Sequence, residues 1–294
     1  MSAPRPLTVP MTVPLTDASG PDLLTRMLAR RRPLVMGILN VTPDSFSDGG
    51  QFFAPEPAIA QAERMAAEEA DILDIGAEST RPYGGQQPVT ADEEQARLAP
   101  VLPAVIAIGR ARGIPVSIDT IKATTAAWAL EQGAAIVNDV WGLQRDPDMA
   151  RVAAAHRVPV IVMHNRDTAD PAIDIVADVN AFFERSLAIA ERAGIARDSI
   201  VLDPGIGFGK TPQQSMICIA RLAAFRAFGL PLLVGASRKR FIASVVPSEP
   251  RQRVPGSLAA HLLAVENGAA IIRAHDVAET VQALRINAAL RSLQ

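Results

Sequence analysis

The chain has 294 residues, a formal net charge of −2 and 49% hydrophobic residues. This length fits one large α/β domain or two ordinary ones, and the apolar content is enough for a sizeable core. The small net charge argues against nucleic acid or an anionic membrane surface as a partner. The single cysteine, Cys218, excludes an internal disulfide and a thiolate zinc site, and no apolar run reaches the roughly 18 residues of a membrane span.

The beginning of the chain is expected to be a loosely ordered leader. Residues 1–21 include five prolines and lack the continuous apolar core of a signal peptide. We therefore expect residues 1–30 to precede one domain of residues 31–294, in a soluble, cytoplasmic protein.

Short apolar or β-branched runs then alternate with longer segments whose apolar residues recur at helical spacing, such as 55–70 and 176–194. The expected strands are Leu34–Leu39, Ile72–Ile75, Pro115–Ile118, Ala135–Val137, Val158–Met163, Ile200–Leu202, Pro231–Val234 and Ala270–Ile272. Strands that alternate with helices pair in parallel through right-handed crossovers. Eight such units favour an α/β fold of the (β/α)₈ or TIM barrel type, as a single domain. A doubly wound open sheet is the alternative.

Polar or ionisable residues follow all eight expected strands. They are Asn40, Glu78 to Arg81, Asp119, Asn138 with Asp139, His164 with Asn165, Asp203, Ser237 to Lys239, and Arg273 with His275. In a barrel the carboxyl ends of the strands converge on one mouth, where the active site lies. One Asp or Asn after a strand is often only a helix N-cap, but eight polar positions together predict a functional mouth.

The residue types at this mouth suggest what it binds. Asp119, Asn138 and Asp203 each directly follow an apolar strand, so they are expected to be buried acceptors. Carboxylates accept strong charge-assisted hydrogen bonds, and this set suits a flat heterocycle with adjacent N–H donors. The alternative for Asp119 is a helix N-cap, and the alternative for Lys239 is a solvated basic cluster with its arginine neighbours.

Basic residues and long loops complete the predicted mouth. Arg81, Arg273 and His275 suit a phosphate or diphosphate, and Asn40 offers an amide oxygen to a hard cation such as Mg²⁺. No G-x-S-x-G nucleophile motif occurs. The loops 40–53 and 79–94 are long for a compact barrel, so they are expected to be lids or binding loops.

The glycine-rich stretch LDPGIGFGKT, residues 202–211, looks like a nucleotide loop but fits neither nucleotide motif. A P-loop requires glycine where Pro204 stands, and the dinucleotide fingerprint fails because residue 210 is lysine. We interpret the stretch as a turn that follows Asp203 and passes close to a flat ring, with Phe208 against the edge of that ring.

Seven runs of the chain resemble the dihydropteroate synthase family of pterin-binding enzymes. They are VMGILNVTPDSFSDGG (35–50), ILDIGAESTRP (72–82), VSIDT (116–120), IVNDV (136–140), VLDPGIGFGK (201–210), VGASRKRF (234–241) and IRAHDV (272–277). The resemblance implies a (β/α)₈ transferase of folate biosynthesis that requires Mg²⁺ and forms a homodimer. Such an enzyme joins 6-hydroxymethyl-7,8-dihydropterin diphosphate to 4-aminobenzoate and releases diphosphate.

The resemblance also implies roles for individual residues. The pterin-binding set is Asp119, Asn138, Asp203 and Lys239, with Met163, Phe208 and Gly235 lining the slot. Asn40 corresponds to an asparagine that contacts the metal and the diphosphate, and Arg273 and His275 correspond to the anion site. The positions around the aminobenzoate are Phe46, Thr80, Arg81, Pro82 and Ser237. Asp48 corresponds to an aspartate that steadies positive charge during a dissociative substitution.

The chain departs from the family pattern at Tyr83, which stands after STRP where a glycine is expected. That change bears on sulfonamide affinity, although the absence of inserted residues between Gly205 and Lys210 favours a sulfonamide-sensitive enzyme. The stretch 164–166 is assigned no catalytic role. The alternatives are a pterin-binding methyltransferase, which has no use for a diphosphate site, and a non-catalytic pterin-binding paralogue.

Overall fold

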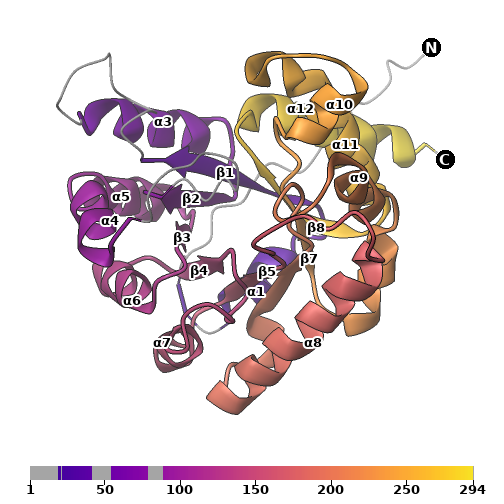
Figure 1. Cartoon of the computed structure of the whole chain (residues 1–294). Helices are drawn as coiled ribbons and strands as arrows, with labels where there is room; N and C mark the ends of the chain where they lie inside the picture. Colours follow the sequence, from indigo (N-terminus) through magenta and orange to yellow (C-terminus); the bar gives the residue numbers. More distant parts are fainter. Residues whose placement is uncertain (1–18, 21, 42–53, 79–88, 294) are drawn as a thin grey trace, which may run out of the picture.

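The computed structural model describes residues 19–20, 22–41, 54–78 and 89–293. Within these ranges the strands form one closed, all-parallel barrel in chain order, and the last strand pairs with the first (Figure 1). The strands are β1 Leu34–Asn40, β2 Ile72–Gly76, β3 Val116–Asp119, β4 Ile136–Asp139, β5 Val160–Met163, β6 Ile200–Asp203, β7 Leu232–Val234 and β8 Ala269–Ala274. The predicted barrel is therefore confirmed, and the open-sheet alternative is wrong.

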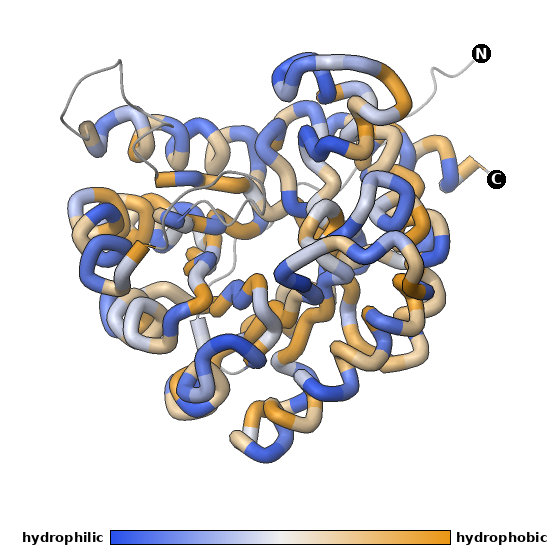
Figure 2. The backbone as a smooth tube through the Cα atoms, in the orientation of Figure 1, coloured by the Kyte–Doolittle hydropathy of each residue, from blue (hydrophilic) through white to orange (hydrophobic). Residues whose placement is uncertain are grey.

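Helices pack around the outside of the barrel and across one of its ends (Figure 1). They are α1 Leu23–Leu28, α3 Glu56–Ala67, α4 Ala91–Leu98, α5 Leu102–Arg112, α6 Ala123–Gln132, α7 Met149–His156, α8 Ile175–Ala193, α9 Pro212–Ala220, α10 Arg240–Val245, α11 Val254–Glu266 and α12 Val277–Arg291. Three short 3₁₀ helices, Arg197–Ser199, Leu222–Phe228 and Pro250–Arg253, complete the described elements. Along the outer helices polar and apolar residues alternate (Figure 2), as expected for elements with one face on the barrel.

The strands bury both of their faces, and the two faces belong to different clusters. The larger cluster joins residues such as Leu73 and Val137 to the apolar faces of the helices. The smaller cluster fills the barrel interior and includes Met36, Ile72 and Ile161. Because strand side chains alternate between faces, each strand contributes every second residue to the interior.

The helix α1 closes the amino-terminal end of the barrel. Leu23, Leu24 and Met27 of this helix are buried in the same cluster as the interior residues of the strands. The expected leader of residues 1–30 therefore ends too late, because 23–28 are an ordered helix on the barrel core. The reason is burial of three large apolar side chains, which stabilises even a short helix. No helix in the described ranges is long and apolar enough to cross a membrane.

Candidate active site at the carboxyl end of the barrel

The interior positions at the ends of the strands form the floor of the mouth. They lie two residues after another interior position of the same strand, so their side chains face the same way. These positions are Asn40, Asp74, Asp119, Asn138, Met163, Asp203, Gly235 and Arg273. Most were predicted to follow strands, but Asn40, Asp119 and Asp203 are the last residues of theirs. Their place in the strand fixes the direction of each side chain.

An acidic cluster occupies one side of this floor. The Arg273 guanidinium donates from Nε to Asp74 Oδ2 at 2.7 Å and from a terminal nitrogen to Asp119 Oδ2 at 2.7 Å. Asn138, the register neighbour of Asp119, donates from Nδ2 to Asp74 Oδ2 at 3.1 Å. Strands β2, β3, β4 and β8 thus contribute one polar side chain each to one buried network.

Two carboxylate oxygens of this cluster are buried and poised for donors. Asp74 Oδ1 and Asp119 Oδ1 accept no hydrogen bond from any residue in the described ranges. Burial, together with the charge of Asp74, raises the pKa of Asp119 to about 7 although Arg273 acts in the opposite direction. A ligand that brings adjacent N–H donors would satisfy both oxygens, since an unpaired buried acceptor is costly.

The cluster also contains a residue that the sequence prediction missed. Asp74 is fully buried in the middle of β2, and the prediction considered only residues that follow strands. The signal was present in the run Ile72 to Ile75, because a carboxylate inside an otherwise apolar strand requires partners. The ligand-free structure also shows where Arg273 lies before any anion binds. Its guanidinium pairs with Asp74 and Asp119 within the floor, so the predicted anion site at Arg273 stays a prediction.

Asp203 lies across the floor at the end of β6. Its Oδ1 accepts the backbone N–H of Gly205 at 2.7 Å, and its register neighbour on β5 is Met163. Burial raises the pKa of Asp203 to about 6, against the opposing effects of the Gly205 hydrogen bond and the charges of Lys239 and Arg273. The carboxylate is therefore ionised at neutral pH and held in one orientation.

An apolar wall stands beside Asp203. Val140, Met163 and Phe208 form one buried cluster at the mouth. The Lys239 ammonium lies 4.0 Å from the centre of the Phe208 ring, a favourable cation–π contact. A side chain at Gly207 would meet the Lys239 stem at 3.3 Å, so the glycine leaves room for this lysine. The wall and the acidic floor together suit a flat, polar-edged ring.

The late strands bring the remaining described candidates together. His275 donates its backbone N–H to Ser237 Oγ at 3.2 Å, and its ring Nδ1 lies 2.9 Å from the same oxygen. Gly235 lies beside Arg273, whose Cβ would be 3.7 Å from a Cβ at residue 235. Asn40 ends β1 at the rim and is partly exposed. In the described ranges no cluster of three His, Cys, Asp or Glu side chains could hold a metal ion.

Several predicted residues lie outside the described ranges. They are Phe46, Asp48, Thr80, Arg81 and Pro82, together with Tyr83. Glu78 is the last described residue before the range 79–88, and it pairs with Lys122. Lys122 also lies 3.2 Å from the buried Glu94, so β2 and β3 are tied together just beyond the floor.

Comparisons with known proteins identify the family. The family model described as "Pterin binding enzyme" matches residues 36–275. The dihydropteroate synthase of Bacillus subtilis is 44% identical over 84% of this chain and 85% of its own length. The structure of the Xanthomonas albilineans dihydropteroate synthase with 4-aminobenzoic acid superposes with a TM-score of 0.83, at 44% identity, over 88% of this chain and 93% of that chain.

A third relative is the Yersinia pestis dihydropteroate synthase in a sulfonamide drug complex, with a TM-score of 0.81 and 41% identity. That comparison covers 90% of this chain and 96% of the relative. Both the matched length of the sequence and the superposed structure agree with these relatives. The chain therefore belongs to the pterin-binding enzyme family and, within it, to the dihydropteroate synthases.

Proposed function

We propose that the barrel mouth joins 6-hydroxymethyl-7,8-dihydropterin diphosphate to 4-aminobenzoate by dissociative substitution, with the residues of the floor in distinct roles. The observation that carries this proposal is the buried pair of unpartnered oxygens on Asp74 and Asp119, beside the apolar wall of Met163 and Phe208. A pterin is flat, and its pyrimidine edge presents adjacent N–H donors.

The pterin would bind with its donor edge on the acidic floor and its ring against Phe208. Asp119, Asn138 and Asp203 would hold the edge, and Lys239 would cover the ring face beside Phe208. Donors of the pterin would then replace the Arg273 guanidinium at Asp119. This exchange would free Arg273 to turn towards the diphosphate, near His275 and Ser237 on the neighbouring strand ends.

The reaction would begin when the C–O bond between the pterin methylene and the diphosphate breaks. The electron pair leaves with the diphosphate, whose negative charge Arg273 and His275 would stabilise. The methylene cation that remains would be stabilised by the Asp203 carboxylate, with Asp48 of the first loop as a second anion. Such preorganised charges act strongly in a site from which water is excluded.

The amine of 4-aminobenzoate would then supply its lone pair to the methylene carbon and release one proton. A neutral arylamine needs no strong base, which agrees with the lack of a nucleophilic triad motif in this chain. Phe46, Thr80, Arg81, Pro82 and Ser237 are proposed to surround this substrate. Because the Xanthomonas and Yersinia relatives bind 4-aminobenzoic acid and a sulfonamide, we expect sulfonamides to compete at the same place.

Magnesium is proposed as the cofactor, held at Asn40. A hard cation that keeps several waters needs only one or two protein oxygens when the substrate supplies phosphates. Asn40 at the rim fits this limited demand, and the described residues offer no dedicated metal cage. When bound, the ion would neutralise charge on the diphosphate.

A homodimer is proposed through α11 and α12. These helices pack against each other and carry large apolar side chains that are exposed on the single chain. Ile286 and Leu290 lie four residues apart on α12, opposite the buried Val277 and Leu284. Leu293, just beyond the end of α12, and Leu263 of α11 are also exposed. An Ile286→Glu variant should sediment as a monomer where the wild type sediments as a dimer, and a dimeric variant would contradict this interface.

The dissociative step can be tested with ¹⁸O in the bridging position of the pterin diphosphate. Reversible ionisation on the enzyme lets the label scramble into the non-bridging oxygens before the product forms. We expect scrambling in recovered substrate when a non-reactive analogue of 4-aminobenzoate holds the site closed. Full retention of the label in the bridge, with an active enzyme, would contradict the dissociative step.

A further inference from the structure

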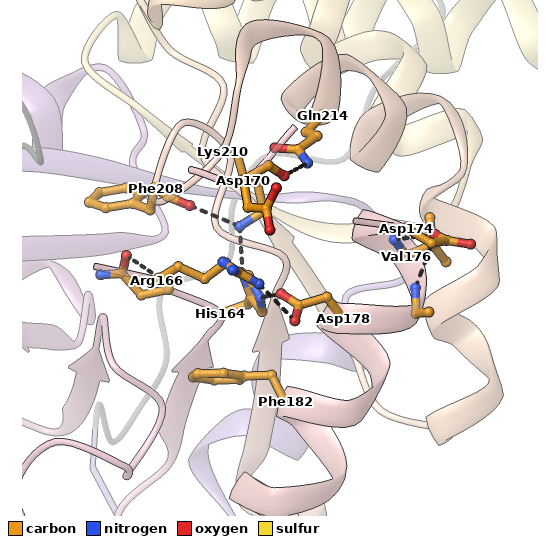
Figure 3. A network of polar contacts seen from close by, with 12 residues as sticks. His164, Arg166, Asp170, Asp174, Val176, Asp178, Phe182, Phe208, Lys210 and Gln214 are labelled. Atoms are coloured by element: carbon orange, nitrogen blue, oxygen red, sulfur yellow. Dashed lines mark hydrogen bonds and ion pairs between the residues drawn. The ribbon is translucent and has the colours of Figure 1, made fainter. Parts of the chain in front are cut away.

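Lys210 ends the glycine-rich turn and has no role in the mechanism above. It is one of the largest fully buried side chains in the described part of the chain, with 2% of its surface exposed. Its ammonium lies 2.6 Å from Nδ1 of His164 and donates to the backbone oxygen of Phe208 at 3.1 Å (Figure 3). Burial of an ammonium costs free energy unless the group is fully hydrogen-bonded, so a buried lysine at this place suggests a specific role.

The histidine that receives this ammonium is held in one tautomer. His164 is fully buried at the end of β5, and its Nε2 lies 2.9 Å from Asp178 Oδ2 on α8. Burial and the charge of Lys210 lower the pKa of His164 to about 4, so the ring is neutral at pH 7. A carboxylate only accepts, so Nε2 carries the proton and Nδ1 is left to accept from Lys210.

The carboxylate at the far end of this chain of contacts is also fixed. Arg166 lies 2.9 Å from Asp178 Oδ1, so each oxygen of Asp178 has its own partner. The hydrogen bond from His164 and the charge of Arg166 hold the pKa of Asp178 below its usual range. The order Asp178, His164, Lys210 therefore links the outer helix α8 to the turn after β6.

The glycine-rich turn lies directly on the segment that carries His164. A Cβ at Gly205 would be 1.9 Å from the His164 carbonyl oxygen, and one at Gly209 would be 2.4 Å from Arg166 Cβ. His164 also donates its backbone N–H to the Asp203 carbonyl at 2.8 Å. Any shift of the 164–166 segment would thus be transmitted to the turn and to Asp203.

Two features of the active site depend on where Lys210 is held. Its hydrogen bond to the Phe208 carbonyl fixes the residue whose ring forms the apolar wall under Lys239. Its positive charge is one of the influences that lower the pKa of Asp203 against the effect of burial. The titratable groups that face Lys210 are Asp203, Asp178, Arg166 and His164, with Cys218 on α9.

The protonation states of this cluster are set by burial. Burial lowers the pKa of Lys210 to about 8, so the side chain is mostly an ammonium at neutral pH. Burial also raises the pKa of the Cys218 thiol to about 11, which keeps the sulfur neutral. Near pH 7 Lys210 therefore carries a positive charge that acts on Asp203, and Cys218 carries no charge.

We propose that Lys210, oriented by His164 and Asp178, is a positioning residue for the reaction, because it holds the 203–210 turn in place and supports the ionised carboxylate of Asp203. This inference rests on the proposed function. If Lys210 only stabilised the fold, its substitution would lower the unfolding temperature and leave the kinetics of the folded enzyme unaltered. A positioning role predicts that the kinetics change as well.

The test compares kcat/KM for diphosphate release across pH in the full chain. Lys210→Met keeps the length of the side chain and removes its charge, which disfavours the ionised Asp203. We expect the acid limb of the profile to move to higher pH, by at least about half a pH unit, because a positive charge that lowers the pKa of Asp203 is lost. We also expect kcat to fall by about tenfold, as for a misplaced reacting group.

The matched control is Asp71→Asn at the opposite end of the barrel. Asp71 is also buried and accepts from Arg32 at 2.7 and 2.8 Å and from the backbone N–H of Val35 at 2.9 Å. This variant should lower the unfolding temperature and leave the pH profile in place. If Lys210→Met behaves in the same way as this control, the positioning role is wrong.

A second variant decides the question if Lys210→Met does not fold. Asp178 is partly exposed on α8, so Asp178→Ala is a mild change that removes both carboxylate oxygens and with them the acceptor which selects the His164 tautomer. We expect kcat/KM to fall several-fold without an upward move of the acid limb, since no positive charge is lost. Kinetics equal to the wild type would overturn the inference. An inactive wild-type enzyme would instead contradict the proposed function itself.

Discussion

The substitution Asp203→Asn separates the charge of this residue from its shape. Asparagine has the same size and keeps one oxygen that can accept the Gly205 N–H, now at 2.7 Å from Asp203 Oδ1. The barrel and the turn should therefore be unchanged. What the variant loses is the negative charge that is proposed to stabilise the methylene cation, and one charge-assisted bond to the pterin.

The size of the loss follows from Coulomb's law. A unit charge about 4 Å from the cation contributes about 4 kcal/mol at an effective dielectric of about 20. Removal of that term slows the ionisation step by about 10³-fold. The lost bond to the pterin weakens the ground state and the transition state alike, so it should raise KM. The lost charge acts only on the transition state, so its effect should appear in kcat.

The same variant should be more stable than the wild type. Burial raises the pKa of Asp203 from 3.8 to about 6, so the native state holds its proton more tightly than the unfolded state does. Stability from this group is present below pH 4 and is lost as pH rises to about 6. At pH 7 the ionised group costs about 3 kcal/mol, which the amide removes.

Steady-state diphosphate release and thermal unfolding at pH 7 measure both effects on one preparation. We expect the variant to turn over about two to three orders of magnitude more slowly than the wild type and to unfold at a higher temperature. Turnover close to the wild-type rate would refute the role assigned to Asp203. A lower unfolding temperature would instead show that the favourable interactions of the ionised carboxylate outweigh the cost of its burial.

Three further predictions follow from the same site. In the wild type, kcat/KM should fall as pH drops below about 6, because Asp203 then gains a proton; a flat profile down to pH 5 would contradict this. Gly205→Ala should lower the free energy of unfolding by at least about 1–3 kcal/mol in chemical denaturation, since the residue has φ +65° and its Cβ would meet the His164 oxygen at 1.9 Å; unchanged stability would show that the turn can move. Chelation of Mg²⁺ should abolish diphosphate release while binding of a pterin without diphosphate persists in calorimetry, and loss of both would place the ion elsewhere.

The barrel could be predicted because each of its strands is a short apolar run between helical segments. Period-two alternation then fixes which residues face inward, as Ile72 and Ile161 do in the interior cluster. The ends of the elements were less certain by one or two residues, since Asn40 and Asp119 are paired in the sheet although they are polar. The helix 23–28 was missed because a single apolar turn after prolines gives a weak pattern.

The site was only partly open to prediction. Acceptors at strand ends, such as Asn138 and Asp203, could be found because polar residues after apolar strands are conspicuous. The acidic floor could not, because Asp74 and Arg273 are 199 residues apart and their contact depends on closure of the barrel. The role of Lys210 could not be predicted for the same reason. Its partners are distant in the sequence, since His164 follows β5 and Asp178 lies on α8.

The most direct test of the central claim is diphosphate release by the purified wild-type chain with Mg²⁺ and defined substrates. We predict sustained release only when 6-hydroxymethyl-7,8-dihydropterin diphosphate and 4-aminobenzoate are both present, with one equivalent of 7,8-dihydropteroate formed per diphosphate. Absence of release with both substrates, or equal release without 4-aminobenzoate, would contradict the assignment of this barrel mouth as the condensing site.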